Sequence, residues 1–422
     1  MDSHTRNSTF RHILAVLLFG LTLGLIFWGN YSTLATESGR MTNKDFMSLW
    51  TGGKAITLGL NPYDAEVWRP LRAAYGSTWM PDRIAPFPLW TFLFFVPFSF
   101  LSTQAAGALW MTLCELALVS GIFLTTRMLG WKGRAPLLLL LGAALFRPVF
   151  PAIANGQLSP LLFLFLPATY VLHERGHPFA AGLLLALQAV KPNLGIILLP
   201  TVGVIFLIRR DWRALIGMVT GGLILLATSW IVLPGWLFQW LAAAEKGQVA
   251  YATPTLWGLA YELGGGQLWP GSAIGAGALL YLGLLFSLWR QRRSDWLFGF
   301  GLAVTVSTFL TPYLWAYEQL VLLFPTIIAL HWGLTSKRGP RWAWWAGWWL
   351  IGVVLSWLLL FVAQQREVDT WSAFIPLASL GYFVLARQSS QNRRHYPAWI
   401  AKPVVSTQAD ERDLSENSPQ RH

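Results

Sequence analysis

Long apolar runs recur from one end of this chain to the other, and they constrain its fold more than any other feature. Each run is close to the roughly 20 residues that a helix needs to cross the hydrocarbon of a bilayer. Hydrophobic residues make up 55% of the chain and charged residues 12%, with a mean hydropathy of +0.48. The runs are continuous, as around Leu137 and Leu350, which excludes the short alternating strands of a β-barrel. The sequence therefore predicts an all-α polytopic membrane protein.

The runs predict about twelve transmembrane helices. They lie near residues 11–30, 105–127, 135–152, 157–172, 178–190, 194–208, 214–234, 271–289, 296–312, 317–333, 342–362 and 370–387.

Clusters of Lys and Arg between the runs predict the orientation, because such clusters favour the cytoplasmic side. With twelve spans, every cluster falls on one side and both chain ends are cytoplasmic. The run 87–101 would invert this order if it crossed the membrane. Because it is short and holds Pro88 and Pro97, we interpret it as a re-entrant or interfacial segment. The net charge of +12 follows from cytoplasmic loops that meet anionic lipid, so no nucleic-acid partner is expected.

These assignments divide the chain into one transmembrane domain over residues 1–387 and a polar tail over 388–422. The tail is rich in Ser, Asn, Gln and charge, and we expect it to be disordered in the cytoplasm. Residues 30–104 form the first extracytoplasmic loop together with the re-entrant or interfacial segment. The first apolar run lacks a clear cleavage site and is expected to remain as an anchor.

A polar stretch over 30–83 separates the first apolar run from the rest and must lie outside the bilayer. Its charged residues are Asp45, Lys54, Asp64, Arg69 and Arg72, among others. Apolar side chains recur there with helical spacing, at Phe46, Leu49, Trp50, Ile56 and Leu58. This pattern predicts an amphipathic helix on the outer leaflet that carries Asp45 at its start.

Three charged residues lie within or beside the predicted spans. Glu115 is in the middle of a span, so it is either paired with a partner or lines a cavity. Arg147 and Lys191 are near the depth of lipid headgroups, where a cation either extends harmlessly to the interface or binds a lipid phosphate.

The combination suggests a chemistry. A carboxylate and two cations at headgroup depth, beside an aromatic-rich outer cleft, suit a reaction that uses a lipid-phosphate substrate. The acid would act as general base, and Arg147 and Lys191 would hold the leaving phosphate. The outer loops have no His/Asp cluster with metal-ligand spacing, so neither a metal nor a cofactor is expected. Cys114 is the single cysteine and excludes an internal disulfide.

An ordered series of motifs resembles glycosyltransferase family 87, a family of polytopic C-type glycosyltransferases that includes mannosyltransferases of phosphatidylinositol mannoside synthesis. The series is Asp45-Phe46, Gly59-Leu60-Asn61-Pro62-Tyr63-Asp64, Pro86-Phe87-Pro88-Leu89, Asn155-Gly156-Gln157, Ala181-Gly182 with Lys191-Pro192, and Thr311-Pro312-Tyr313. Each motif is weak alone, but their order over residues 40–325 is fairly specific.

The resemblance implies a C-type glycosyltransferase fold and an inverting transfer of mannose or a related hexose. The donor would be a polyprenyl-phosphate sugar, and the acceptor a lipid or glycan on the outer face of the plasma membrane, among membrane lipids. One carboxylate of the first extracytoplasmic loop acts as base in such enzymes, and the matching residue here is Asp45. We expect the substrate to be bound by Tyr63, Asn155, Gln157, Tyr317 and Glu318. Relatives often carry His or Asp where this chain has Tyr317-Glu318, so Glu318 is expected either to orient an acceptor hydroxyl or to assist the base.

Two other classes compete with this interpretation. A transporter or flippase of polyprenyl lipids or sugars tends to place its binding groups near the midplane, often with inverted repeats. Here Glu115 is the one clearly deep acid, and no repeat of fixed period is visible. A non-catalytic scaffold has no reason to carry an ordered series of polar outer motifs.

Overall fold

Helices form almost all of the ordered chain. The computed structural model describes residues 3–36, 44–77, 84, 87–131, 133, 135–247, 253–266, 270–290, 296–337 and 339–390, and no strand occurs in these ranges. Each of the predicted apolar runs coincides with one helix or with two or three consecutive helical segments. The last helix continues to Ser389, into the predicted tail over 388–422. From residue 391 onward the tail lies outside the described residues.

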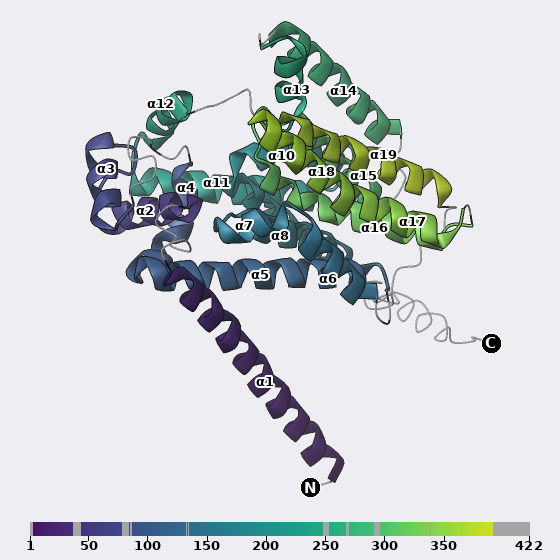
Figure 1. Cartoon of the computed structure of the whole chain (residues 1–422), viewed down its shortest axis with the longest axis horizontal. Helices are drawn as coiled ribbons and strands as arrows, with labels where there is room; N and C mark the ends of the chain where they lie inside the picture. The colour runs from purple at the N-terminus through teal and green to yellow at the C-terminus, as the bar shows by residue number, and fades with distance from the viewer. Residues whose placement is uncertain are drawn as a thin grey trace, which may run out of the picture.

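The elements of the N-terminal half follow one another with short connections (Figure 1). In chain order they are α1 Ser3–Leu34, α2 Asp45–Thr57, α3 Ala65–Ala74, α4 Leu89–Phe95, the 3₁₀ helix η2 Val96–Phe100, α5 Thr103–Met128, α6 Ala135–Leu145, α7 Val149–Ala154, α8 Ser159–Glu174, α9 Pro178–Ala186, the 3₁₀ helix η3 Leu187–Val190, α10 Pro192–Arg209 and α11 Trp212–Val232.

The C-terminal half continues the bundle. Its elements are α12 Trp236–Gly247, α13 Leu256–Leu263, α14 Pro270–Arg290, α15 Trp296–Leu310, the 3₁₀ helix η4 Ala316–Leu322, α16 Leu323–Thr335, α17 Arg341–Trp349, the π-helix η5 Leu350–Leu355, α18 Ser356–Arg366, the 3₁₀ helix η6 Thr370–Ala373 and α19 Phe374–Ser389.

Six helical stretches among the described residues are long and apolar enough to cross a membrane. They are Val16–Leu34, Thr103–Met128, Pro192–Arg209, Trp212–Val232, Ala316–Thr335 and Arg341–Arg366. Most of the other predicted spans form shorter helices, such as α6 and α7, which are separated by Phe146, Arg147 and Pro148. A proline cannot continue the hydrogen-bond ladder, which accounts for this break. The protein is an all-helical membrane protein, and the count of twelve spans stays a prediction.

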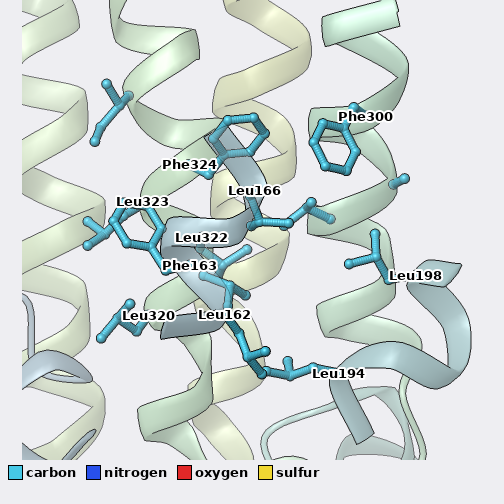
Figure 2. Close-up of a cluster of buried hydrophobic side chains, with 14 of the residues drawn as sticks. Leu162, Phe163, Leu166, Leu194, Leu198, Phe300, Leu320, Leu322, Leu323 and Phe324 are labelled. Atoms are coloured by element: carbon cyan, nitrogen blue, oxygen red, sulfur yellow. The ribbon is translucent and has the colours of Figure 1, made fainter. Parts of the chain in front are cut away.

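A core of buried hydrophobic side chains joins the helices. Figure 2 shows side chains of α8, α10, α15, η4 and α16 that meet there, among them Phe163, Leu198 and Phe324. Close approach of backbones also contributes, as expected where lipid weakens the hydrophobic drive between helices. A Cβ atom on Gly182 of α9 would lie 2.0 Å from the carbonyl oxygen of Ala214 in α11. Glycine is therefore required at this crossing.

The helix α2 begins at Asp45 as predicted, but the expectation that it is amphipathic on the outer leaflet is wrong. Its residues from Phe46 to Gly53 are all buried, on every side of the helix. The reason is the pair Gly52-Gly53, which lets α4 and η2 pack directly on the helix. A Cβ atom on Gly52 would lie 2.0 Å from the ring of Phe92, and one on Gly53 would lie 2.7 Å from the backbone of Phe95.

The run 87–101 forms the short pair α4 and η2, which ties three segments together. Trp50 of α2 donates its indole N–H to the carbonyl oxygen of Phe98 at 3.1 Å. On the other side, Trp90 donates to the carbonyl of Ala189 at 2.9 Å, and Thr91 donates to that of Val190 at 2.5 Å. The pair therefore links α2 to the end of η3. In Figure 1, α2, α3, α4 and α12 lie together at the left end of the bundle.

The helix α1 runs diagonally away from the bundle in Figure 1 and contacts α5 near its C-terminal end. Asn30 donates its amide N–H to Thr112 at 3.1 Å and to Glu115 at 3.2 Å. This contact decides between the two expectations for Glu115, because the half-buried carboxylate has a partner across the helix pair.

Candidate active site

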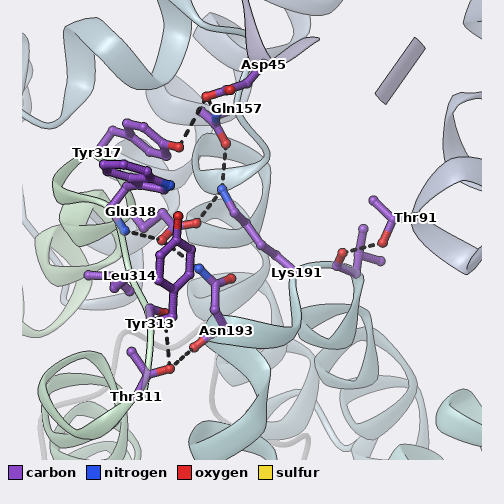
Figure 3. A network of polar contacts seen from close by, with 12 residues as sticks. Asp45, Thr91, Gln157, Lys191, Asn193, Thr311, Tyr313, Leu314, Tyr317 and Glu318 are labelled. Atoms are coloured by element: carbon purple, nitrogen blue, oxygen red, sulfur yellow. Dashed lines mark hydrogen bonds and ion pairs between the residues drawn. The ribbon is translucent and has the colours of Figure 1, made fainter. Parts of the chain in front are cut away.

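Four segments that lie far apart in the sequence bring polar side chains to one place (Figure 3). Asp45 starts α2, Gln157 lies between α7 and α8, Lys191 precedes α10, and Tyr317 and Glu318 lie in the first turn of η4. All of them were predicted as site residues from the sequence. The structure joins them in one chain of hydrogen bonds and ion pairs.

The carboxylate of Asp45 accepts two hydrogen bonds on the same oxygen. Gln157 donates its amide N–H to Oδ2 at 2.5 Å, and the hydroxyl of Tyr317 donates to Oδ2 at 3.2 Å. Neither donor belongs to α2, although a carboxylate at a helix start commonly binds the free N–H groups of its own first turn. Asp45 is therefore directed at other segments.

The turn Asn155-Gly156-Gln157 fixes the start of α2. The carbonyl oxygen of Asn155 accepts the N–H of Phe46 at 3.0 Å. Gly156 has a φ of 65°, and a Cβ atom there would lie 2.7 Å from Cβ of Phe46. A left-handed conformation and a close approach both favour glycine. Asn155 thus contributes through its backbone, and the amide of Gln157 reaches Asp45.

Lys191 is buried between two acceptors. Its ammonium donates to Oε1 of Gln157 at 2.5 Å and forms an ion pair with Oε1 of Glu318 at 2.5 Å. The ring of Tyr317 lies 5.1 Å from Nζ. Lys191 is 4% exposed and Glu318 is fully buried, so each depends on the other for its charge to be tolerated.

The other carboxylate oxygen of Glu318 holds its own loop in place. Oε2 accepts the amide of Asn193 at 2.7 Å and the backbone N–H of Trp315 at 2.7 Å. The hydroxyl of Thr311 donates to the carbonyl of Asn193 at 2.5 Å. Thr311 belongs to the Thr-Pro motif of the sequence and Asn193 directly follows Lys191-Pro192, but neither was predicted as a site residue. The Thr-Pro turn and the residue after Lys-Pro were the available signals.

Burial raises the pKa of the Asp45 carboxyl above its ordinary value. The charge of Lys191 and the hydrogen bonds of Tyr317 and Gln157 counteract this rise in part, and the charge of Glu318 adds to it. A second cation acts on the same carboxylate: burial lowers the pKa of Arg72, which is 1% exposed, and the charge of Asp45 opposes that shift. Arg72 belongs to the polar stretch of the sequence but was not singled out for the site.

Two predicted site residues lie elsewhere. Arg147 forms a two-pronged ion pair with Asp369 at 2.7 and 3.0 Å, so the prediction that it holds a donor phosphate has no support in the geometry. The hydroxyl of Tyr63 donates to the carbonyl of Phe87 at 2.8 Å, and its ring packs on Phe92. Tyr63 thus helps to hold the loop, and its predicted contact with the substrate stays a prediction.

Among the described residues, no group of three His, Cys, Asp or Glu side chains is placed to hold a metal ion. The two acids of the site are bridged by Gln157 and Lys191. The arrangement offers a partly buried carboxylate with fixed direction, one ammonium near it and a hydroxyl aimed at it.

A helical membrane protein with a partly buried acid held by an amide and a phenol, near a buried lysine, has the parts of a group-transfer enzyme. The model of glycosyltransferase family 87 matches residues 86–315, more than half of the chain. The chain belongs to glycosyltransferase family 87 and is a glycosyltransferase. No curated protein and no solved structure matches it. The matched range contains Gln157 and Lys191 but neither Asp45 nor Glu318, so their place in the site rests on geometry.

Proposed function

We propose that the protein is an inverting hexosyltransferase that uses a polyprenyl-phosphate sugar, with mannose as the expected sugar. The acceptor would be a hydroxyl of a lipid or glycan on the outer face of the plasma membrane. The observation that carries the proposal is the partly buried carboxylate of Asp45, held by Gln157 and Tyr317 beside Lys191.

Asp45 would act as the general base. Inversion needs a base that takes the proton of the acceptor hydroxyl while the hydroxyl attacks the anomeric carbon from the face opposite the leaving phosphate. A raised pKa makes the carboxylate a better proton acceptor than an ordinary exposed aspartate. The donors from Gln157 and Tyr317 bind one oxygen, Oδ2, which directs Oδ1 to the acceptor.

Lys191 would stabilise the phosphate as it leaves. An ammonium has three N–H bonds, and Gln157 and Glu318 take two of them. The charge of Glu318 offsets that of Lys191 before the donor binds, so an entering phosphate competes with Glu318 for the ammonium. Glu318 itself would position Lys191 and the loop of Trp315 rather than accept the proton, since its second oxygen already accepts two N–H groups.

The outer location rests on the basic clusters of the sequence. They favour the cytoplasmic side, and the cluster near Asp211 lies at the ends of α8 and α10 opposite to the ends at Gln157 and Lys191. The site would therefore face away from the cytoplasm, where a lipid-linked sugar is available without a nucleotide.

The test uses purified protein in lipid nanodiscs with polyprenyl-phosphate mannose and candidate lipid acceptors. We expect a mannosylated product with inverted anomeric configuration, as measured by NMR of the product. The variant Asp45→Asn should give none, while Glu66→Gln, which removes an exposed acid of the neighbouring helix α3, should retain full activity. Movement of the intact donor between leaflets without any transfer would favour a flippase instead.

A further inference from the structure

A second buried polar cluster joins the break between α6 and α7 to η6. Arg147 donates from Nη1 to Oδ1 of Asp369 at 3.0 Å and from Nη2 to Oδ2 at 2.7 Å. Nη1 also donates to the hydroxyl of Ser372 at 2.8 Å, and that hydroxyl donates to Asp369 at 2.5 Å. The charged side chains are 12% and 18% exposed, so this ion pair is largely removed from water. Two parallel bonds of this kind fix orientation as well as distance.

The cluster continues into the segment that carries the candidate active site. The backbone carbonyl of Ser372 accepts the amide N–H of Gln319 at 2.9 Å, and the carbonyl of Pro254 accepts it at 3.4 Å. Gln319 and Ser372 are both fully buried. Gln319 directly follows Tyr317 and Glu318 in η4, the two residues that contact Asp45 and Lys191.

Other contacts hold this segment on the N-terminal side of Tyr317, and on its C-terminal side η4 continues directly into α16. The hydroxyl of Thr253 donates to the carbonyl of Leu314 at 2.9 Å and accepts its N–H at 2.8 Å. Thr311 is bound to the backbone of Asn193 at 2.5 Å. These contacts fix residues before Tyr317, whereas Gln319 fixes the residues after it. The position of the Tyr317 hydroxyl depends on both.

We propose that the Arg147–Asp369 ion pair is a positioning clamp for η4, which holds Tyr317 and Glu318 in register with Asp45 and Lys191 through Ser372 and Gln319. The inference rests on the proposed function, in which Asp45 is the base. Arg147, Asp369, Ser372 and Gln319 are positioning residues and contact no substrate. A misplacement of about 1 Å at such a site is sufficient to cost about 100-fold in rate.

The test compares three variants with the wild type in nanodiscs. Asp369→Asn removes the charge at constant shape, Arg147→Lys keeps the charge but loses the fork, and the exchange Arg147→Asp with Asp369→Arg restores an ion pair with reversed polarity. We expect kcat to fall about 10- to 100-fold in the first two variants, with KM changed less than about threefold, and partial recovery in the exchange variant. Asp211→Asn is the control, since Asp211 is 21% exposed in an ion pair with His173 elsewhere in the molecule.

A loss of folded protein also lowers kcat, so two further readouts separate the explanations. Hydrogen exchange of residues 311–322, measured by mass spectrometry, should accelerate in Asp369→Asn but not in Asp211→Asn. The acid limb of the pH–rate profile should also move to higher pH, because the Tyr317 hydrogen bond lowers the pKa of Asp45 and is weakened when η4 shifts. The charges of Lys191, Glu318 and Arg72, which also act on Asp45, are retained in this variant.

The outcomes are distinguishable. Unchanged exchange of residues 311–322 in Asp369→Asn, or an unmoved acid limb at reduced kcat, overturns the clamp while the proposed function stands. Absence of hexose transfer by the wild type overturns the proposed function. In that case faster exchange in Asp369→Asn still supports the clamp of η4, and unchanged exchange rejects it.

Discussion

The helices α8 and α10 have a polar cluster at each of their two ends. The acids of the two clusters differ in whether they have a structural role in the fold. At one end, Gln157 and Lys191 meet Asp45. At the opposite end, His173 lies between Glu174 and Asp211, with hydrogen bonds from Nε2 to Asp211 and from Nδ1 to Glu174 at 3.4 Å.

Each acid of the opposite cluster also has a local structural role. Asp211 caps α11 by accepting the N–H of Ala214 at 3.3 Å, and Glu174 accepts the indole N–H of Trp296 at 2.9 Å. Asp211 binds a backbone N–H that the start of α11 leaves unsatisfied, and Glu174 binds the side chain of the first residue of α15. The cluster is explained by the fold alone.

Asp45 has no comparable role. Its hydrogen bonds come from side chains of two distant segments, and the start of α2 is fixed instead by the backbone of Asn155. A fold that retains a partly buried carboxylate without using it as a cap bears its desolvation cost for another reason. The comparison therefore separates a structural acid from a candidate base, although both are partly buried and hydrogen-bonded.

The largest difference is expected for the same substitution at the two ends. Asp45→Asn should lower kcat about 10² to 10⁴-fold, since the acceptor loses its base, with little change in thermal midpoint. Asp211→Asn should lower the thermal midpoint in detergent and leave kcat per folded molecule within about twofold, because it removes the charge paired with His173 while asparagine can still cap α11. Comparable activities of the two variants would remove the distinction.

Removal of Lys191 should affect stability and activity together. Lys191→Met leaves the buried charge of Glu318 without its partner, which costs about 3–5 kcal/mol in comparable pairs. The double variant Lys191→Met with Glu318→Gln should recover much of the thermal midpoint but not the transfer rate. Recovery of the rate as well would show that the ammonium is needed only for folding.

A smaller effect is expected for the hydroxyl of Tyr317. Tyr317→Phe removes one hydrogen bond to Asp45 and should lower kcat about 10-fold. That bond lowers the pKa of Asp45, so its loss should move the acid limb of the pH–rate profile to higher pH. Tyr382→Phe serves as control, because the buried Tyr382 hydroxyl donates to the carbonyl of Trp344 at 2.8 Å, away from the site. A profile shifted equally in both variants would contradict the contact.

The smallest effect concerns the pH dependence of the opposite cluster. Burial lowers the pKa of His173, but the hydrogen bonds to Asp211 and Glu174 outweigh it, and the pKa is raised. The stabilisation by His173 is thus complete below its unfolded pKa of about 6.5 and disappears as the pH rises through the folded value.

The pKa of Asp211 is lowered, chiefly by the hydrogen bond from His173, so its contribution is present above about pH 4 and disappears at lower pH. The difference in thermal midpoint between wild type and His173→Gln should therefore be largest near pH 5 to 6 and shrink toward pH 8. A constant difference would indicate that His173 contributes by packing alone.

The positions of the helices were predictable from the sequence because continuous apolar runs specify membrane helices directly. Asp45, Gln157, Lys191 and Glu318, which lie together in the structure, were candidates from the sequence because each lies in or beside a turn motif, and their roles stay predictions. The predicted topology placed all these turns on the same side of the membrane, so the sequence indicated that these residues share one surface. No contact between them was predicted, because hydropathy gives the depth of a residue but not its neighbours.

Because hydropathy does not give neighbours, the contacts of Arg147 and Tyr63 and the burial of α2 were not predicted. The depth of Arg147 was compatible with a phosphate, but its partner Asp369 is 222 positions away and nothing local indicates the pairing. Tyr63 lies in a family motif, yet its hydroxyl satisfies a loop carbonyl. The helical spacing at Phe46 suggested one apolar face, while Gly52-Gly53 was the signal that a second helix covers the rest. Adjacent glycines in an apolar helix deserve to be interpreted as a contact with another backbone.

The 3₁₀ helices η2, η3 and η6 share a feature that bears on how this sequence varies among related chains. Each presents backbone carbonyls to long side chains of other segments: Phe98 to Trp50, Ser99 to Lys54, Ala189 to Trp90, Val190 to Thr91 and Ser372 to Gln319. Every residue type has a backbone carbonyl, so the residue that carries the acceptor can be substituted while the hydrogen bond remains. The donor is replaceable only by a side chain with the same reach. Substitutions should accordingly accumulate at Phe98, Ala189 and Val190 over evolutionary time while Trp50, Trp90 and Gln319 stay fixed.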